Sequence, residues 1–426
     1  MDIHVVRAGE TVSSVAARYG VPAGILAGVN GVAPDAPLAV GQTLVVRHPR
    51  ELHTVASGES VYSIALRYGL SVRTLYQNNP ALGGRSALYP GQTLVIAYDD
   101  TPTRTLAVNA YSYPFIRGGL LDAALPYLTY LTPFTYGINA DGTLLPLADE
   151  WLLAAAGQYR TAALMHLSTL TEEGRFDNAR STLILEDADA QDALVQSILE
   201  TVQARHYFGL DVDFEYVLPE QREAYAAFIT RLREALNPLG CPVIVALAPK
   251  TSAAQRGLLY EAHDYALLGA AANAVFLMTY EWGYTYGSPQ AISPVNRIRR
   301  VLDYAVTVMP VGKILMGFSN YAYDWLLPWR QGQAARILSN AAAAELAISR
   351  GAEIRYDYTA QAPWFNYTDA AGRTHVVWFE DARSVVARLQ LVGEYSLAGI
   401  SIWTADKVYR PGLYALQSMY SVEKLL

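Results

Sequence analysis

The stretch FGLDVDFEY, residues 208–216, indicates both the fold class and the chemistry of this protein. Within it, Asp211, Asp213 and Glu215 alternate with a leucine, a valine and a phenylalanine. Because successive side chains of a β-strand point to opposite faces, the carboxylates share one face, about 6.6 Å apart per step. The apolar side chains share the other face, which would pack under helices. The pattern therefore predicts a strand with one buried face and one face that carries chemistry.

Similar apolar segments alternate with helical patterns along the chain that follows a polar linker at residues 99–103. The expected strands are 106–110, 131–136, 161–167, 209–214, 243–248, 275–279, 314–318 and 399–403, and helical patterns include 191–203, 221–235 and 295–306. Buried strands that alternate with helices are typical of a parallel α/β fold, and such units over about 320 residues fit a (β/α)8 TIM barrel. A doubly wound sheet is the alternative. Residues 325–377, rich in Tyr and Trp, are expected to form a small α+β insertion.

The acids of residues 211–215 favour a catalytic role. Catalytic groups of a TIM barrel lie at the carboxyl ends of its strands, and Glu215 is the outermost of the acids. Like charges this close raise at least one pKa, which keeps a carboxylic acid protonated near neutral pH. Two other interpretations stay open at this point, a solvated edge strand and a set of oxygen ligands for Mg²⁺ or Ca²⁺.

Composition and charge exclude several classes of protein. The chain has 426 residues, of which 52% are hydrophobic and 17% charged, so a disordered chain is excluded. Its net charge of -7 has the wrong sign for a nucleic-acid partner. A single cysteine, Cys241, excludes intramolecular disulfides, and the histidines lack the spacing of metal ligands. We expect no membrane insertion, because no apolar stretch reaches the roughly 20 residues of a spanning helix, and the first residues show no secretory signal.

The front of the chain contains a repeat. The segment AGETVSSVAARYGV at residues 8–21 matches SGESVYSIALRYGL at 57–70, and each is followed by a Gly-Gln turn. Apolar residues in the first copy recur with helical spacing and end at Gly20, which is suited to stop a helix. A short strand before this helix, a second helix and a closing strand complete a predicted βααβ unit in each copy.

These repeats resemble the LysM module, a family that binds glycans containing N-acetylglucosamine, such as peptidoglycan and chitin. We expect modules at residues 1–48 and 51–98, ahead of a catalytic barrel at 103–426. In the family, the glycan lies between the first strand–helix turn and the loop before the last strand. The residues that the resemblance assigns to glycan binding are Gly9, Glu10, Thr11, Asn30, Gly58, Glu59, Ser60 and Asn79.

The acidic strand resembles the fourth strand of the family-18 glycoside hydrolases (chitinases and relatives), whose motif is DGxDxDxE. Phe208 stands in place of the first Asp, the member farthest from the substrate. The segment MTYE at residues 278–281 resembles the family's MxYD, and a tryptophan and an aromatic residue match near the last and first strands. The substrate-binding residues implied by this resemblance are Tyr111, Met278, Glu281, Trp282 and Trp403.

The same resemblance implies a mechanism in which the substrate supplies its own nucleophile. Glu215 would act as the general acid and then as the base. Asp213 would orient the acetamido N–H, Asp211 would share a proton with Asp213, and Tyr280 would bond the acetamido oxygen. The result would be an oxazolinium intermediate and net retention. No metal and no organic cofactor is implied.

Two LysM modules ahead of such a barrel, with the segments LTPFTYGINADG and MTYEWGYTYGSPQAISPV, resemble the spore cortex-lytic N-acetylglucosaminidases of spore-forming bacteria. This likeness, over essentially the whole chain, implies a peptidoglycan hydrolase that acts on cortex glycan strands. We expect a monomer located in the spore coat or cortex. A glycan-binding protein without catalysis is one alternative, but Glu215 is present. A chitinase is another, but no export signal is visible.

Overall fold

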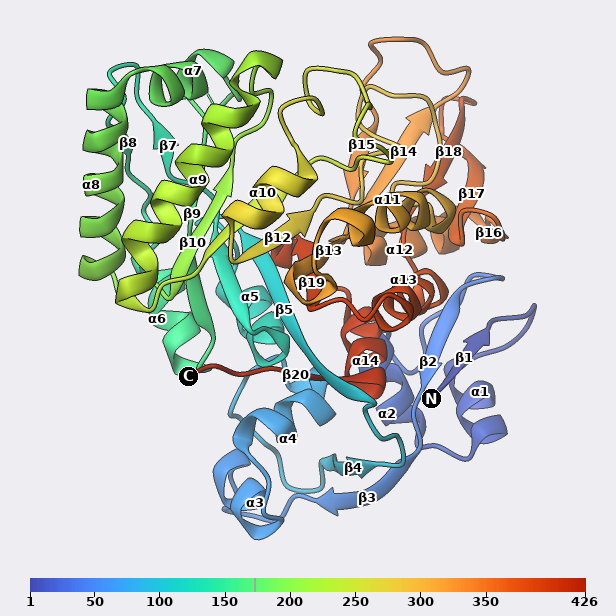
Figure 1. Ribbon diagram of the computed structural model, residues 1–426. Coiled ribbons are helices and arrows are strands. Elements are labelled where there is room, and N and C mark those ends of the chain that lie inside the picture. The colour runs from blue at the N-terminus through green and yellow to red at the C-terminus, as the bar shows by residue number, and fades with distance from the viewer. Residues whose placement is uncertain (172–173) are drawn as a thin grey trace.

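The computed structural model describes residues 1–171 and 174–426, and in this part of the chain eight parallel strands close into a barrel (Figure 1). They are β5 (Arg104–Ser112), β6 (Tyr130–Pro133), β9 (Ala162–Ser168), β10 (Gly209–Asp213), β11 (Val243–Leu247), β12 (Ala274–Leu277), β13 (Ile314–Ser319) and β19 (Gly399–Trp403). Each strand predicted from the sequence overlaps one of these. The (β/α)8 prediction is confirmed. The doubly wound alternative is wrong, because β19 pairs with β5 and so removes the open edges of such a sheet.

Helices cover the outside of the barrel and pack on it through apolar faces. They are α5 (Gly118–Ala124), α6 (Glu150–Gln158), α7 (Asn178–Glu186), α8 (Ala188–Ala204), α9 (Arg222–Leu236), α10 (Tyr265–Ala271), α11 (Val295–Val308), α13 (Ala382–Glu394) and α14 (Arg410–Met419). In α11, the buried residues Val295, Ile298 and Val301 recur with helical spacing, which places them all on the barrel side. In the described part of the chain, no single helix is long and apolar enough to cross a membrane.

Shorter elements complete the barrel. β7 (Gly137–Ile138) and β8 (Leu144–Leu145) form a small antiparallel pair, and β20 (Tyr420–Val422) lies beside the first residues of β5. Single 3-10 turns occur at η1 (Pro80–Leu82), η2 (Leu125–Tyr127), η3 (Pro219–Gln221), η4 (Asn237–Leu239), η5 (Val311–Lys313) and η6 (Ala405–Lys407).

A second sheet stands between β13 and β19, in the region that the sequence predicts to be an insertion. It is antiparallel, with strands β14 (Ala322–Leu326), β15 (Arg336–Leu338), β16 (Arg355–Asp357), β17 (Ala362–Thr368) and β18 (Thr374–Trp378), and helix α12 (Asn340–Arg350) packs on it. Phe365 and Val377 are fully buried in its core. The insertion therefore has its own apolar core beside the barrel.

The two N-terminal repeats fold as the predicted βααβ units. The first consists of β1 (Asp2–Val5), α1 (Val12–Tyr19), α2 (Ala23–Asn30) and β2 (Thr43–Val46), and the second of β3 (Pro49–Thr54), α3 (Val61–Arg67), α4 (Val72–Asn78) and β4 (Thr93–Tyr98). α1 and α2, bent by 115° at the break between them, meet the length and composition of a membrane span only when taken together. Thr11 and Ser60 cap the first helix of each unit through reciprocal hydrogen bonds with a serine three residues later.

Both modules are fixed to the end of the barrel where the strands begin (Figure 1). The second module contacts loops that precede strands: Gln77 Nε2 donates to Pro126 O at 2.8 Å, just before β6. The first module contacts the insertion, because Ile354 N donates to Val40 O at 2.8 Å. At Gly41 a Cβ would lie 1.9 Å from Ile354 O. This close approach requires glycine at position 41.

Replacing Gly41 by alanine should therefore destabilise the protein more than the same change at Gly91, its counterpart in the second module. Both glycines have positive φ, +84° and +85°, but no atom of the described residues lies within 4 Å of a Cβ at Gly91. The backbone strain of about 1–2 kcal/mol is common to both variants, whereas the clash is specific to Gly41→Ala. Thermal unfolding measures the difference. Equal losses in the two variants would contradict the tight contact between the first module and the insertion.

Candidate active site

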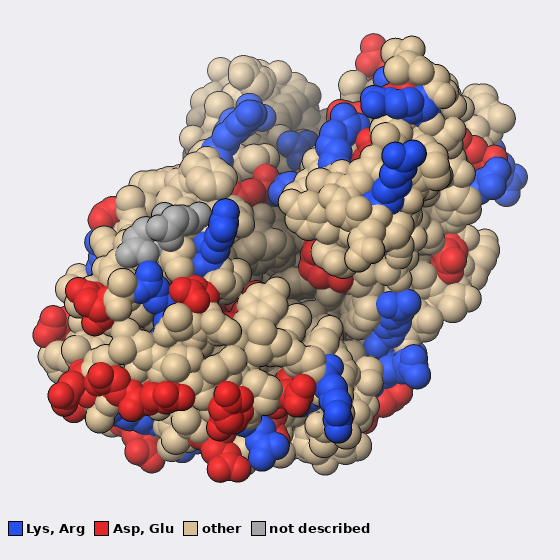
Figure 2. All heavy atoms as spheres, turned by 90° about the horizontal axis from the view of Figure 1, so that it is seen from above, with Lys and Arg blue, Asp and Glu red and all other residues tan. Residues whose placement is uncertain are grey.

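The acids of β10 gather at the carboxyl end of the barrel. Asp211 and Asp213 point into the barrel and are 1% and 6% exposed. Glu215, just past the end of β10, is half-buried. The apolar residues between them lie in the core shared with the helices, as the alternating pattern predicts. Figure 2 looks onto this end of the molecule and shows a hollow between two raised parts of the surface.

Asp211 is supported from the first strand. Tyr111 Oη donates a 2.5 Å hydrogen bond to Asp211 Oδ2, and its ring is 2% exposed. The sequence analysis assigned Tyr111 to substrate binding, but this burial leaves little of its ring free to meet a sugar. We therefore place it as a support of Asp211.

Burial controls the protonation of the two aspartates. It raises the pKa of Asp211, against the hydrogen bond from Tyr111, and it raises the pKa of Asp213, with a further increase from the charge of Asp211. Among the described residues, Oδ1 of each aspartate has no hydrogen-bond partner. A single proton held by the pair would remove the repulsion between two buried charges.

A histidine that the sequence analysis did not single out lies beside these aspartates. His166, on β9, is fully buried, and its Nε2 is 3.7 Å from Asp213 Oδ2. Its Nδ1 is 2.6 Å from Thr135 Oγ1. Burial lowers the pKa of His166 to about 3, so the ring is neutral near neutral pH. His166 could have been identified only from the parallel register of β9 and β10, which places it next to Asp211. The sequence of a single strand does not contain this register.

Glu215 faces side chains from the loops that follow β12 and β13. Burial raises the pKa of Glu215, and the charges of Asp213 and Glu281 raise it further. The Glu281 carboxylate accepts hydrogen bonds from Tyr321 Oη and, at 3.0 Å, from Tyr323 Oη. Sequence reasoning missed the role of Tyr321, because its partner lies 40 residues away. Glu215 is thus held in conditions that favour its protonated form.

Tyr280 and Trp403 complete the walls of the site. Tyr280 is half-buried, and burial raises the pKa of its hydroxyl, with smaller contributions from the acids around it, Asp213 first. The Trp403 ring, at the end of β19, packs 5.3 Å from Tyr111 and 4.9 Å from Phe134, centroid to centroid. Met278 lies in the same cluster as both, half-buried.

Trp282 and Phe208, two other residues that the resemblance singles out, pack against apolar clusters. Trp282 is half-buried and packs against the core between barrel and helices. Phe208, which replaces the first motif Asp, packs 5.9 Å from Tyr130 at the start of β10, the opposite end of the strand from Glu215. Its side chain is therefore well separated from the reacting acids.

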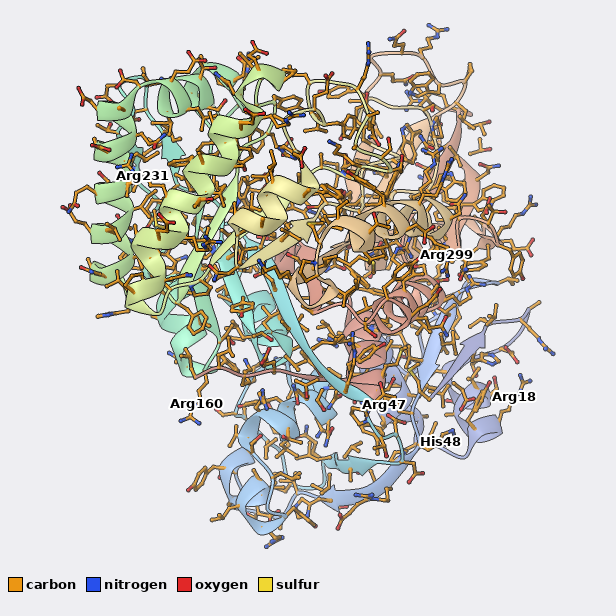
Figure 3. All side chains as sticks on the ribbon, in the orientation of Figure 1. Arg18, Arg47, His48, Arg160, Arg231 and Arg299 are labelled. Carbon is orange, nitrogen blue, oxygen red and sulfur yellow. The ribbon has the colours of Figure 1, made fainter. Side chains whose placement is uncertain are left out.

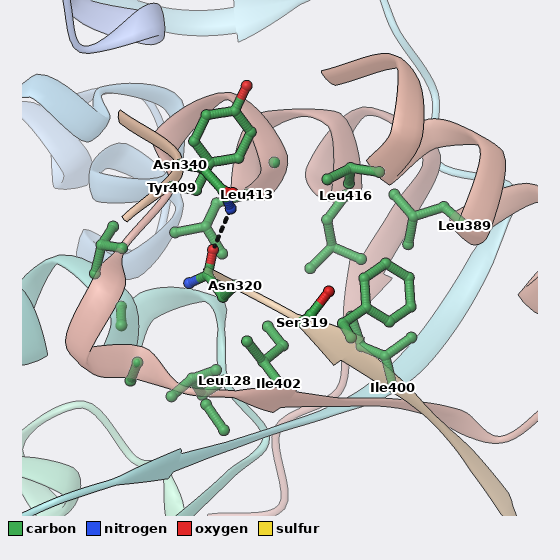
Figure 4. Close-up of a pocket in the computed structure, with 17 residues that line it drawn as sticks. Leu128, Ser319, Asn320, Asn340, Leu389, Ile400, Ile402, Tyr409, Leu413 and Leu416 are labelled. Carbon is green, nitrogen blue, oxygen red and sulfur yellow. Dashed lines mark hydrogen bonds between the residues drawn. The ribbon is translucent and has the colours of Figure 1, made fainter. Parts of the chain in front are cut away.

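Two other kinds of candidate site, a metal site and an interior cavity, compare poorly with this one in the described residues. In residues 1–171 and 174–426, no group of three or more His, Cys, Asp or Glu side chains could hold a metal ion, so the geometry gives the cation interpretation no support. An interior cavity of about 50 Å³ lies between the barrel and α14, lined mostly by apolar side chains such as Leu389, Ile400 and Leu416 (Figure 4). It is packing space within the core.

The residues that the sequence analysis assigned to glycan binding in the modules mostly hold the modules together. Glu10 accepts hydrogen bonds from the Arg7 amide and from His4, and Glu59 repeats the pattern. Asn30 bonds the backbone of Leu26 and Val45, and Asn79 does the same in the second module. The turns at Gly9 and Gly58 are exposed, and Thr11 and Ser60 beside them are exposed helix caps. Their contact with glycan stays a prediction.

Comparison with protein families gives two matches. The model of the glycosyl hydrolases family 18 matches residues 171–407. The model of the LysM domain matches residues 4–47 and 53–97. The first match contains the acids of β10 as well as Tyr280 and Trp403, and the second coincides with the two βααβ units.

Individual relatives match the whole chain or a large part of it. The cortical fragment-lytic enzyme of Bacillus subtilis (strain 168) is 38% identical over 435 residues, covering 100% of this chain and 99% of its own. The crystal structure of the spore cortex-lytic enzyme SleL of Bacillus cereus superposes with a TM-score of 0.84 at 36% identity, covering 99% of this chain and 98% of that one. A chitinase from Chromobacterium violaceum gives a TM-score of 0.69 at 27% identity, over 74% of this chain and 98% of that one.

The raised pKa of Asp213 has a consequence for stability. A carboxyl whose pKa is higher in the folded than in the unfolded chain stabilises the fold less as the pH rises from about 4 toward the folded pKa, by about 1.4 kcal/mol per pH unit. Asp213→Asn cannot ionise. Its melting temperature, relative to wild type, should therefore be higher at pH 8 than at pH 5. Asp35→Asn, at an exposed position, is the matched control. A difference that does not change with pH would contradict the raised pKa of Asp213 in the folded protein.

Proposed function

The chain belongs to the family-18 glycosyl hydrolases, and from this premise we propose that it is a retaining N-acetyl-β-D-glucosaminidase of spore cortex peptidoglycan. The observation that carries the proposal is the half-buried Glu215 above the buried aspartates. A carboxylic acid with a raised pKa can donate a proton to a glycosidic oxygen at neutral pH. The cortex as substrate rests on the full-length relatives, which are named as cortical fragment-lytic and spore cortex-lytic enzymes.

In the proposed mechanism, Glu215 protonates the glycosidic oxygen while the 2-acetamido oxygen of the substrate attacks C1. An oxazolinium ion forms, the leaving sugar departs, and Glu215 then removes a proton from the water that opens the ring. Since both displacements invert C1, the configuration is retained. Glu215 has to return to its protonated form before each turnover, which burial and its acidic neighbours favour.

Asp213 and Tyr280 would act on the acetamido group. When substrate binds, the shared proton would pass from Asp213 to Asp211, and the ionised Asp213 would accept the acetamido N–H and offset the positive charge that grows on the ring. The Tyr280 hydroxyl would donate to the acetamido oxygen, and Trp403 would support the apolar face of the sugar. Holding the acetamido group in the position of attack supplies the proximity part of the rate enhancement.

The modules extend this proposal to binding and location. LysM modules imply glycan as the partner, and we propose that both modules attach the enzyme to peptidoglycan in the spore coat or cortex. We propose further that the protein acts as a monomer. The similar chitinase covers 74% of this chain, whereas the cortex-lytic relatives cover 99% and 100% of it, which favours cortex over chitin.

The test is mass spectrometry of the products released from purified spore cortex and from cortex fragments by wild type and by Glu215→Gln. Wild type should release products that end in reducing N-acetylglucosamine. Glu215→Gln should be slower by about 10³-fold, since the acid is lost. Glu353→Gln, an exposed position, should match wild type. Equal release by wild type and Glu215→Gln would overturn the assignment of the acid. Binding to cortex without release by either would favour the non-catalytic glycan-binding alternative.

The pH profile tests the coupling between Glu281 and Glu215. The charge of Glu281 raises the pKa of Glu215, so Glu281→Gln should lower it. Because the acid must be protonated to react, the alkaline limb of kcat/KM should move to lower pH in Glu281→Gln. The measurement is kcat/KM on soluble cortex fragments from pH 5 to 10, with Glu353→Gln as control. An alkaline limb at the same pH in Glu281→Gln and wild type would show that the charge of Glu281 does not act on the pKa of Glu215.

A further inference from the structure

We propose that a cavity between the second LysM module and the base of the barrel is an anion site that binds a carboxylate-bearing sugar. The cavity has a volume of about 530 Å³. Ser71, Arg73 and Tyr76 line it from α4 and the residue before it, Tyr159 and Arg160 from just after α6, and Lys424 and Leu426 from the last residues of the chain. Figure 3 labels Arg160 at the base of the barrel, beside the second module. The choice of N-acetylmuramic acid as the sugar rests on the proposed function.

The charge of the cavity favours an anion. Arg73, Arg160 and Lys424 all line it, and in the part of the chain that the structure describes none of them makes an ion pair with a carboxylate. Among the described residues, Arg73 Nη1 is buried without a hydrogen-bond partner. The described partners of Lys424 Nζ are neutral groups, the nearest of them Thr161 Oγ1 at 2.8 Å. A carboxylate here would meet cations from both the module and the barrel.

The lowered pKa values of the half-buried Lys424 and Arg73 show that their positive charges are unfavourable in this cavity. Burial lowers the pKa of Lys424 to about 7, and the charge of Arg73 lowers it further. Burial also lowers the pKa of Arg73. Asp122 lies behind Gly84, close enough for its charge to raise the pKa values of Tyr76 and Tyr159, but among the described residues it forms no ion pair with the cations of the cavity. A bound anion would relieve the repulsion between these cations, and Arg binds carboxylates through paired hydrogen bonds.

The remaining lining suits a sugar rather than a small inorganic anion. The half-buried ring of Tyr159, 6.4 Å from the buried ring of Tyr76 at an angle of 52°, offers aromatic surface to the apolar face of a pyranose. Ser71 and Gln158 add polar groups at the rim. A cavity of this size, with aromatic surface and a few polar groups, is typical of sites for small organic ligands. The sugar acids of peptidoglycan combine a pyranose with a carboxylate.

The site is preformed and separate from the catalytic cleft. Gly84 has φ +74°, and a Cβ there would lie 2.5 Å from Tyr159 Oη, so the module loop is seated directly on the barrel. Tyr159 Oη also donates to Gly84 O at 3.2 Å. The cavity uses the start of α4 rather than the turn at Gly58 that the LysM resemblance assigns to glycan. The α4 helix and the C-terminus lie at the end of the barrel where the strands begin (Figure 1), whereas Glu215 follows the end of β10.

The test is isothermal titration of the full-length protein with N-acetylmuramic acid, which has no bond for the enzyme to cleave. Wild type should bind it, and N-acetylglucosamine, which lacks the carboxylate, should bind at least tenfold more weakly. Arg160→Gln and Arg73→Gln should each weaken binding of N-acetylmuramic acid at least tenfold. Arg297→Gln, exposed on α11, is the matched control and should bind as wild type. Because Arg160 is exposed, its variant should keep the wild-type melting temperature.

Several outcomes would overturn the proposal. Unchanged affinity in both Arg73→Gln and Arg160→Gln would place the sugar elsewhere, including in the LysM grooves. Inorganic phosphate that competes as well as N-acetylmuramic acid would reduce the site to a simple anion site. Equal binding of both sugars would remove the role of the carboxylate. If wild type fails to hydrolyse cortex, only the proposed function is overturned. The sugar titration does not depend on bond cleavage and still tests the anion site.

Discussion

The buried carboxyls of Asp211 and Asp213 are the constraint on which the active site depends. Two acids inside a closed barrel, with unpaired oxygens, are unfavourable when both are charged, and this raises their pKa values. The barrel can hold them because apolar clusters fill much of its interior and its helix-covered surface, and buried polar groups such as Asn109, Thr132 and Ser401 hydrogen-bond one another. Neutral His166 and the Tyr111 hydroxyl add polar contacts without adding a positive charge. The site thus keeps its protons near neutral pH at the expense of stability.

The modules and the cleft occupy opposite ends of the barrel. The second module is fixed by Gln77 and Gly84 to loops that precede strands, whereas Glu215 follows a strand. The glycan held by the modules therefore need not be the segment held in the cleft of the same molecule. The fixed geometry favours an enzyme that is attached to its matrix while the opposite face meets the bond to be cleaved.

The residues that make the LysM repeat recognisable are mainly those that build it. Glu10 holds His4 and the Arg7 amide, and Asn30 joins the second helix to the closing strand. The same bonds recur around Glu59 and Asn79. Such a motif identifies the fold of the module well, because its side chains satisfy buried backbone groups. It says much less about which atoms touch the glycan.

The sequence by itself determined the barrel strands, the βααβ repeats and the shared face of Asp211, Asp213 and Glu215, because periodicity and turn residues are local properties of the chain. Only the tertiary structure decided that His166 lies beside Asp213, that Tyr321 holds Glu281, and that Arg73, Arg160 and Lys424 share a cavity. These neighbours are tens to hundreds of residues apart in the chain. Lateral register and packing between distant elements set their distances, and no local pattern contains that information.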